Sequence, residues 1–162
     1  MAVEIERKFL VQDGGWRAAA GPGCAYVQGY LCPEGAPSSV RVRIEGEQAN
    51  LNIKAAVIGA ERMEYEYPIA LADARAMLTA LCIGRPVEKT RHRVAHGDHV
   101  WEIDVFAGAN AGLVVAEIEL AAVDEAFARP AWLGREVTHE QSYYNHALAM
   151  HPYRDWQDPD RP

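Results

Sequence analysis

Charged and apolar residues alternate with a period of two along most of this chain. In the segment 3–10, Glu4, Glu6 and Lys8 occupy alternate positions, and mainly apolar residues lie between them. Because successive side chains of a strand point to opposite faces, this pattern predicts β-strands with one charged face and one apolar face. The predicted strands cover residues 3–10, 26–31, 39–45, 51–55, 61–69, 87–94, 99–106 and 113–120.

A few segments favour helix instead of strand. The segment 73–82 consists of good helix formers, and Asp73 is a candidate N-cap. The segment 140–150 predicts a C-terminal helix with Thr138 as its candidate N-cap, and a short helix is expected at 124–129. The chain is therefore expected to be mainly β, with a small number of helices.

The composition fits a single globular domain. The chain has 162 residues, of which 49% are hydrophobic, and this is sufficient for one core. We expect a cytoplasmic protein, because no apolar run could span a bilayer and the N-terminus lacks a signal-peptide pattern. Three cysteines without CxxC spacing argue against a disulfide framework and a zinc site. We expect one domain over residues 1–154 and a frayed polar tail over residues 155–162.

The net charge of −7 argues against a general affinity for nucleic acid or acidic membranes, so neither is an expected partner. The charges that share strand faces fall into a basic set and an acidic set. The basic set is Lys8, Arg41, Arg43, Lys54, Lys89, Arg91 and Arg93. The acidic set is Glu4, Glu6, Glu64, Glu66, Glu102, Asp104, Glu117 and Glu119.

Two folds give this alternation. An open antiparallel sheet with one solvated face is the simpler one, and the period alone favours it. However, these strands carry almost no Thr, Ser, Gln or Asn, and their charges come in like-sign pairs such as Arg41 with Arg43. Like charges so close repel unless an opposite charge lies between them. This favours a barrel whose bore holds the charges and whose outside is packed by helices.

Such a bore would suit a polyphosphate bound together with a metal ion. Carboxylates are preferred ligands of Mg²⁺, which commonly bridges to phosphate. Arginine forks match phosphate oxygens two at a time. The six histidines show no metal-ligand spacing, so we expect them to have structural or solvent-exposed roles.

The residues that carry these charges also resemble a known family. Glu4-Ile5-Glu6-Arg7-Lys8 matches the E-x-E-x-K signature of the CYTH superfamily, also called the triphosphate tunnel metalloenzymes. The later pairs occur in the family's order, and the resemblance spans roughly residues 3–148. It implies an α+β, mainly β fold: an eight-stranded antiparallel closed β-barrel with triphosphate in its tunnel and helices outside. Gln28-Gly29-Tyr30-Leu31 and Glu136-Val137-Thr138 with Tyr144-Asn145 look most like the short bacterial members, several of which hydrolyse inorganic tripolyphosphate.

The resemblance also implies roles for individual residues. Its metal-ligand positions match Glu4, Glu6, Glu117 and Glu119, and its phosphate-binding positions match Lys8, Arg41, Arg43, Lys54, Lys89 and Arg91. From the charge pattern we add Glu102 and Asp104 as candidate metal ligands and Arg93 as a substrate-binding candidate. Tyr30 is either a substrate contact or a packed aromatic residue. Candidate catalytic residues are Lys89 and the carboxylates Glu64 and Glu66, which would orient the attacking water.

The sequence departs from the family at one point. Similar proteins often have a basic residue just before the Tyr-Tyr-Asn of the last helix, whereas this chain has Glu140-Gln141-Ser142. The resemblance therefore gives no support for a phosphate contact from this helix.

The expected function is hydrolysis of inorganic tripolyphosphate to diphosphate and phosphate, with Mg²⁺ or Mn²⁺ as cofactor, by a monomer or homodimer. Within the fold, the alternatives are a nucleoside or thiamine triphosphatase and a class IV-type adenylyl cyclase. A module that binds polyphosphate without turnover is the alternative of another class.

Overall fold

The computed structural model describes residues 2–55 and 61–157, with the side chains of residues 2–4, 61 and 62 left out of the description. Nine strands are present in these ranges. They are β1 (Ala2–Val11), β2 (Cys24–Tyr30), β3 (Ser38–Glu45), β4 (Gln48–Ala55), β5 (Glu61–Pro68), β6 (Ile83–His96), β7 (His99–Ala107), β8 (Val114–Glu119) and β9 (Leu133–Glu136). The helices are α1 (Leu71–Ala80) and α2 (Asn145–Met150), with short 3-10 helices η1 (Gly15–Ala19), η2 (Gly108–Asn110), η3 (Gln141–Tyr143) and η4 (Tyr153–Asp155).

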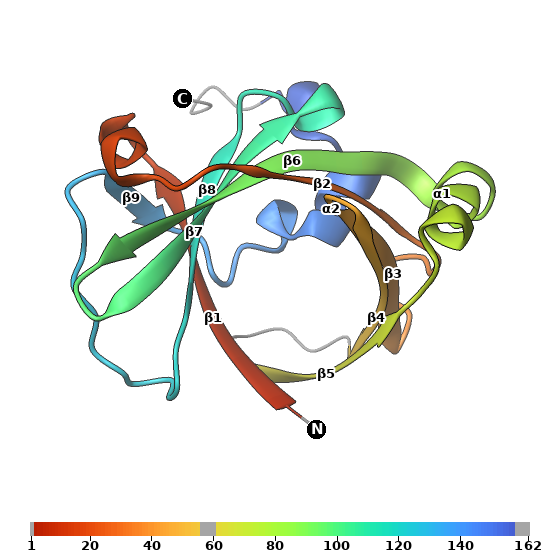
Figure 1. Ribbon diagram of the computed structural model, residues 1–162, viewed down its shortest axis with the longest axis horizontal. Helices are drawn as coiled ribbons and strands as arrows, with labels where there is room; N and C mark the ends of the chain where they lie inside the picture. Colours follow the sequence, from red (N-terminus) through yellow and green to blue (C-terminus); the bar gives the residue numbers. More distant parts are fainter. Residues whose placement is uncertain (1, 56–60, 158–162) are drawn as a thin grey trace.

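The strands form one antiparallel sheet in the order β5-β4-β3-β2-β6-β7-β8-β1-β9. The sheet curls so that β5 also pairs with β1, over residues 61–64 of β5 and 2–5 of β1. Eight strands therefore surround a central space (Figure 1). This confirms the mainly antiparallel barrel that the like-sign charge pairs and the family resemblance predicted. The short β9, which pairs with the end of β1, was not predicted.

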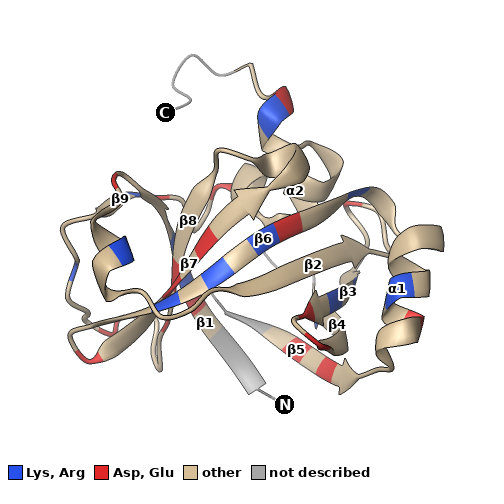
Figure 2. Cartoon of the chain, turned by 45° about the horizontal axis from the view of Figure 1, so that its top comes forward, with Lys and Arg blue, Asp and Glu red and all other residues tan. Residues whose placement is uncertain are grey.

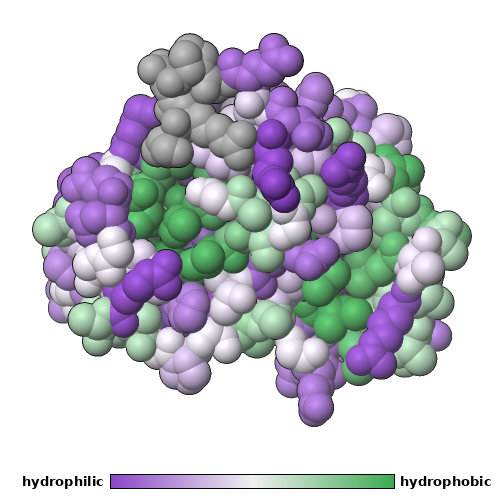
Figure 3. Space-filling view, turned by 90° about the horizontal axis from the view of Figure 1, so that it is seen from above, coloured by the Kyte–Doolittle hydropathy of each residue, from purple (hydrophilic) through white to green (hydrophobic). Residues whose placement is uncertain are grey.

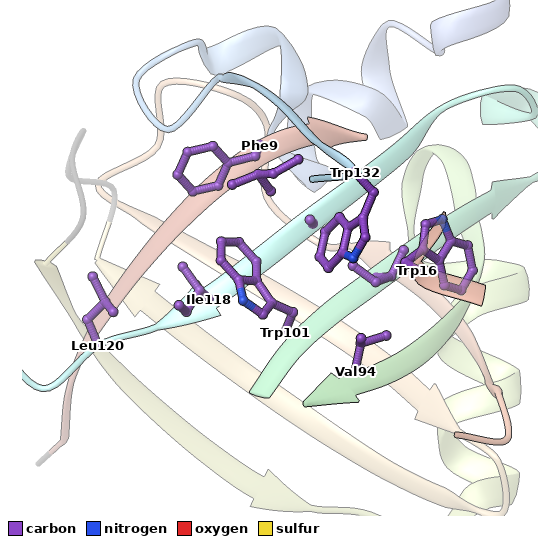
Figure 4. Packing of buried hydrophobic residues seen from close by; sticks show 10 residues of the cluster. Phe9, Trp16, Val94, Trp101, Ile118, Leu120 and Trp132 are labelled. Atoms are coloured by element: carbon purple, nitrogen blue, oxygen red, sulfur yellow. The ribbon is translucent and has the colours of Figure 1, made fainter. Parts of the chain in front are cut away.

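The apolar faces of the strands point outward and are covered in two places. Phe9, Trp101 and Ile118 belong to a core that Trp16 of η1 and Trp132 near β9 complete (Figure 4). On the other side, α1 covers a smaller core on the outer face of β3 and β4. The surface seen in Figure 3 mixes hydrophilic residues with small apolar patches.

The inner faces change from charged to apolar toward one end of the barrel. On β1 the inward position after Lys8 is Leu10, and on β6 the one before Lys89 is Val87. These apolar positions join a third core together with Leu148 of α2. The two main helices therefore differ: α1 packs outside as predicted, whereas α2 packs against the inner face beside β6 and β2 (Figure 1).

Several local expectations need correction. The first helix begins after Ala70, and Asp73 lies in its first turn and makes no side-chain capping bond. The predicted C-terminal helix is divided into η3 and α2, and Thr138 does not cap it. No helix forms over residues 124–129. These differences have a common cause, since tertiary contacts of the segments outweigh weak local propensities.

The part of the predicted tail that the structure describes is packed. The indole of Trp156 contacts the rings of Tyr143 and Tyr153, with centroids 5.1 and 5.0 Å apart. Its Nε1 donates a hydrogen bond to the His151 carbonyl at 3.0 Å. Fraying therefore does not begin at Asp155, and residues 158–162 lie outside the described part of the chain.

In the described residues, no helix is both long enough and apolar enough to cross a membrane.

Candidate active site

The barrel encloses a cavity of about 700 Å³ whose walls are densely charged. Strand alternation brings the predicted charges to it from separate parts of the chain, and Figure 2 shows basic residues along β6 and acidic residues on β5. The basic residues that line the cavity are Lys8, Arg41, Arg43, Lys54, Lys89 and Arg91. The acidic residues that line it are Glu6, Glu34, Glu64, Glu66, Glu117 and Glu119.

One wall of the cavity, built by β6, β7, β8 and β1, is a buried ion network. Lys8 lies 2.8 Å from Glu117, and the guanidinium of Arg91 lies 2.6 Å from the same carboxylate. Arg91 also contacts Asp104 at 2.7 Å and Glu102. Each of these cations has a carboxylate partner, as burial of charge requires.

The electrostatics of this network follow from burial and pairing. Burial acts to raise the pKa of Glu117, but Lys8 and Arg91 outweigh it and hold that pKa well below its ordinary value. Burial and the neighbouring Arg91 lower the pKa of Lys89, against the opposing effect of Asp104. Burial raises the pKa of Glu102, despite the nearby Arg91. The carboxylate of Glu117 is thus kept charged by the two cations that hold it.

The opposite wall is organised around Asn52, which is fully buried on β4. Its Nδ2 donates hydrogen bonds to Glu64 at 3.0 Å and to Glu66, so one amide orients both carboxylates. Lys54 lies 3.2 Å from Glu64, and Arg43 lies 3.2 Å from Glu66. These partners therefore fix the positions of the Glu64 and Glu66 carboxylates beside the basic residues of β3 and β4.

Several buried polar atoms of this region have no hydrogen-bond partner among the described residues. They include Arg41 Nε, Arg43 Nε, Asn52 Oδ1, Asn145 Oδ1 and His146 Nε2. An unpaired buried polar atom is costly, and native structures retain few of them without a reason. Four of these five residues line the cavity, and the arginine atoms can only donate. The cavity is therefore suited to an anion that brings its own acceptors.

Among the predicted residues whose side chains are described, Asp104, Glu102 and Arg93 do not line the cavity. Asp104 is fully buried and is contacted by both Lys89 and Arg91. Glu102 accepts a hydrogen bond from Arg91, and Arg93, its register partner on β6, is exposed. All three have inward parity, but the long Arg91 side chain lies between the two acids and pairs with both. The side chain of Glu4 lies outside the described part of the chain.

Sequence reasoning missed several cavity-lining residues, namely Gln28, Glu34, Ser39, Gln141, Tyr144, Asn145 and His146. Tyr144 and Asn145 carried a signal as part of the family-like Tyr-Tyr-Asn segment. Tyr144 donates a hydrogen bond from its hydroxyl to the Thr138 carbonyl at 2.9 Å. Thr138 Oγ1 in turn accepts the backbone N–H of Lys8 at 3.0 Å, so the segment before α2 is tied to β1.

The carboxylates of β1 and β8 are the candidate cation ligands. Glu6 and Glu119 are register partners directly across these strands, and Glu117 pairs in register with Lys8. Like charges in that relationship repel, and a hard divalent cation prefers such oxygen ligands. The donor chemistry therefore fits a divalent metal, although no cluster of three or more potential ligands is assembled within the described residues.

Comparison with known proteins agrees with this geometry. Residues 2–148 match the CYTH domain family. The chain is 39% identical to an inorganic triphosphatase of Acetivibrio thermocellus, covering 98% of this chain and 100% of that protein. It is 38% identical to an inorganic triphosphatase of Nitrosomonas europaea, covering 91% and 97% of the two chains. The crystal structure of the inorganic triphosphatase NE1496 superposes with a TM-score of 0.67 at 35% identity, covering 90% and 97%. The chain therefore belongs to the CYTH family.

Proposed function

We propose that this protein is a metal-dependent triphosphatase that hydrolyses inorganic tripolyphosphate to diphosphate and phosphate inside the barrel. The observation that carries the proposal is that the Nε donors of Arg41 and Arg43 are buried without a partner among the described residues, in a cavity that acidic residues also line. Two relatives that match over most of the chain are named inorganic triphosphatases. A metal-bound polyphosphate supplies acceptors for both arginine donors and brings a cation that carboxylates can bind.

The basic residues bind and hold the phosphate chain. Arg41, Arg43 and Lys54 reach it from β3 and β4, and Lys89 and Arg91 reach it from β6. Because the acids of the ion network fix Arg91, its guanidinium is in place before substrate arrives, and it stabilises charge as the P–O bond to the leaving group breaks.

We assign the metal site to Glu6 and Glu119, with Glu117 and the position of Glu4 completing it, and we propose Mg²⁺ or Mn²⁺ as the ion. When bound, the ion neutralises phosphate charge and orients the terminal phosphoryl group.

The attacking water is placed by Glu64 or Glu66. Both carboxylates are oriented by Asn52, and both line the cavity. The water oxygen forms a bond to the terminal phosphorus, the bond from that phosphorus to the bridging oxygen breaks, and diphosphate leaves with the electron pair. The water proton passes to the carboxylate or to solvent.

The aromatic residues of the cavity favour the inorganic substrate over a nucleotide. Tyr30 is stacked on His146 with ring centroids 4.5 Å apart, and the hydroxyl of Tyr144 is bonded to Thr138. A base could stack on this face of Tyr30 only by displacing His146. We therefore rank the nucleoside or thiamine triphosphatase and the adenylyl cyclase below the tripolyphosphatase.

A substrate panel tests the proposal. Purified protein with Mg²⁺ or Mn²⁺ is expected to release phosphate from tripolyphosphate faster than from ATP or thiamine triphosphate, and EDTA should abolish release. Formation of cyclic AMP from ATP would favour the cyclase. Tight binding of tripolyphosphate without phosphate release would favour the non-catalytic module.

We also propose that the enzyme works in the cytoplasm as a monomer or homodimer, with no nucleic acid or membrane partner. The three free thiols suit a reducing compartment, and the net charge of −7 disfavours polyanionic partners.

A further inference from the structure

His146 lies at the wall of the cavity, and one of its ring nitrogens makes no hydrogen bond within the described part of the chain. It follows Asn145 at the start of α2 and is one of the residues that line the cavity. Its imidazole stacks on the phenol ring of Tyr30, with centroids 4.5 Å apart and planes inclined by 16°. Its Nε2 is buried and has no hydrogen-bond partner among the described residues. One face of the ring is therefore packed against Tyr30, whereas Nε2 makes no hydrogen bond within the described part of the chain.

The ring of Tyr30 and the backbone of α2, between which the His146 ring lies, are each held by hydrogen bonds. The hydroxyl of Tyr30 accepts a hydrogen bond from Nε2 of the buried Gln28 at 3.0 Å. On the helix side, the buried Asn110 donates to the Leu148 carbonyl at 3.4 Å and accepts the Tyr153 N–H at 2.8 Å. A group held this way loses little conformational freedom on binding a ligand, so its hydrogen bond contributes more to affinity.

A second unsatisfied group lies on the neighbouring strand. Arg41 is the register partner of Tyr30 across β2 and β3, and its Nε is also buried without a partner among the described residues. Arg41 and His146 line the same cavity. Imidazole and guanidinium nitrogens can both donate to a phosphate oxygen.

The place of α2 in the barrel indicates which part of the substrate is bound here. The helix packs with Leu148 and Ala149 into the apolar core that fills one end of the inner face. If the phosphate chain enters from the end opposite this apolar core, its terminal group lies nearest to α2. A terminal phosphate has more non-bridging oxygens that can accept hydrogen bonds than an internal phosphate has.

We infer that His146 is a substrate-binding residue that donates a hydrogen bond from Nε2 to the terminal phosphate at the α2 end of the cavity. The inference rests on the proposed function and adds a phosphate contact from α2, made by a histidine in place of the basic residue that this chain lacks before Tyr143.

Two substitutions separate the hydrogen bond from the stacking. His146→Phe keeps a ring on Tyr30 and removes the donor, whereas His146→Gln keeps a donor and removes the aromatic ring. His139→Gln is the matched control, because His139 is exposed and is not among the cavity-lining residues. The dissociation constant for tripolyphosphate is measured by calorimetry in EDTA, and KM and kcat are measured with Mg²⁺.

We expect His146→Phe to raise both the dissociation constant and KM about tenfold, the effect of one hydrogen bond to a charged group. His146→Gln should stay within about threefold of the native protein, and His139→Gln should not differ from it. If the ring serves only to stack on Tyr30, the order reverses: His146→Phe behaves like the native protein and His146→Gln is impaired. That result would overturn the inference.

A measurement on the native chain does not depend on how the variants fold. The imidazole ¹⁵N resonance of His146, identified by its absence in either variant, should shift when tripolyphosphate is added in EDTA. An unchanged resonance at saturating tripolyphosphate would also refute the inference. If the native protein hydrolyses tripolyphosphate and the His146→Phe variant does so equally well, only this inference is contradicted. If the native protein neither binds nor hydrolyses tripolyphosphate, the proposed function is contradicted.

Discussion

Arg91 of β6 and Asp104 of β7 form a bidentate ion pair. Arg91 Nε lies 2.7 Å from Asp104 Oδ1, and Nη2 lies 2.7 Å from Oδ2. The two residues are register partners, and Asp104 is fully buried. Lys89 donates to the same carboxylate. We therefore propose that Asp104 positions two phosphate-facing cations, instead of the metal-ligand role suggested by its place in the charge pattern.

Asp104→Asn tests that role. The substitution keeps the shape of the side chain but leaves two buried cations short of a negative partner, so the free energy of unfolding should fall by about 3 kcal/mol. Urea unfolding measures this loss. The Mg²⁺ concentration for half-maximal activity should stay the same. A large rise in this concentration would indicate that Asp104 is a metal ligand.

Glu119→Gln probes the proposed metal site without disturbing the fold. Glu119 is exposed and lies across from Glu6, so removing its charge relieves a like-charge repulsion of roughly 0.2–1 kcal/mol. Stability in EDTA should be unchanged or slightly higher, while the Mg²⁺ concentration for half-maximal activity should rise about tenfold. Glu47→Gln, at an exposed turn, is the control. Equal metal requirements in both variants would exclude Glu119 as a ligand.

Arg41→Ala should lose most activity and remain folded. The ion pair of Arg41 with Glu64 is long, at 3.8 Å, and the Arg41 Nε has no partner among the described residues. The fold therefore loses little, whereas turnover should fall by about two to three orders of magnitude. Glu6→Gln is expected to lose activity to a similar extent. Arg75→Ala on the exposed face of α1 is the control, and near-normal turnover of Arg41→Ala would remove Arg41 from the mechanism.

Gly84→Ala should disturb the packing of α2 against β6. Gly84 has φ of +68°, and a Cβ there would come within 2.5 Å of the Ala149 carbonyl oxygen. We expect a loss of stability above about 1 kcal/mol and a higher KM for tripolyphosphate. Gly46→Ala is the matched control, because it has a similar positive φ and only an ordinary contact at 3.7 Å. Equal KM values in the two variants would show that binding does not depend on the position of α2.

Glu136→Gln should flatten the dependence of stability on acid pH. The hydrogen bond from Arg7 at 2.9 Å lowers the pKa of Glu136 from its ordinary value of 4.5. A carboxyl whose pKa is lower in the folded state stabilises the fold above its unfolded pKa, and this contribution is lost as pH falls through the folded value.

Thermal unfolding from pH 6 down to pH 3 measures this effect. The native protein should lose more stability below about pH 4.5 than Glu136→Gln does. The exposed Glu47→Gln should follow the native curve, and so should Glu136→Gln if the ion pair contributes nothing. Activity at neutral pH should be unaffected, because Glu136 is not among the cavity-lining residues.

The alternation along each strand determined which residues face the interior, and the like-sign charge pairs together with the family resemblance indicated a barrel. Which side of a strand a residue faces follows from local backbone geometry alone, so Lys8, Arg41 and Glu117 could be assigned to the interior from their positions in the sequence. The assignment of Arg7 to the outer face, where it meets Glu136, follows from the same rule. The order of like-sign pairs then indicated a bore for a charged ligand, and the family resemblance named that ligand.

Only the tertiary structure decided which inward charges meet the cavity and which meet one another. Asp104 and Glu117 have the same parity, but Asp104 is enclosed by cations and Glu117 lines the space. The burial of α2 against the inner face, and with it the stacking of His146 on Tyr30, likewise depends on residues far apart in the chain. A periodic pattern specifies direction, whereas the reach and pairing of long side chains depend on what packs opposite them.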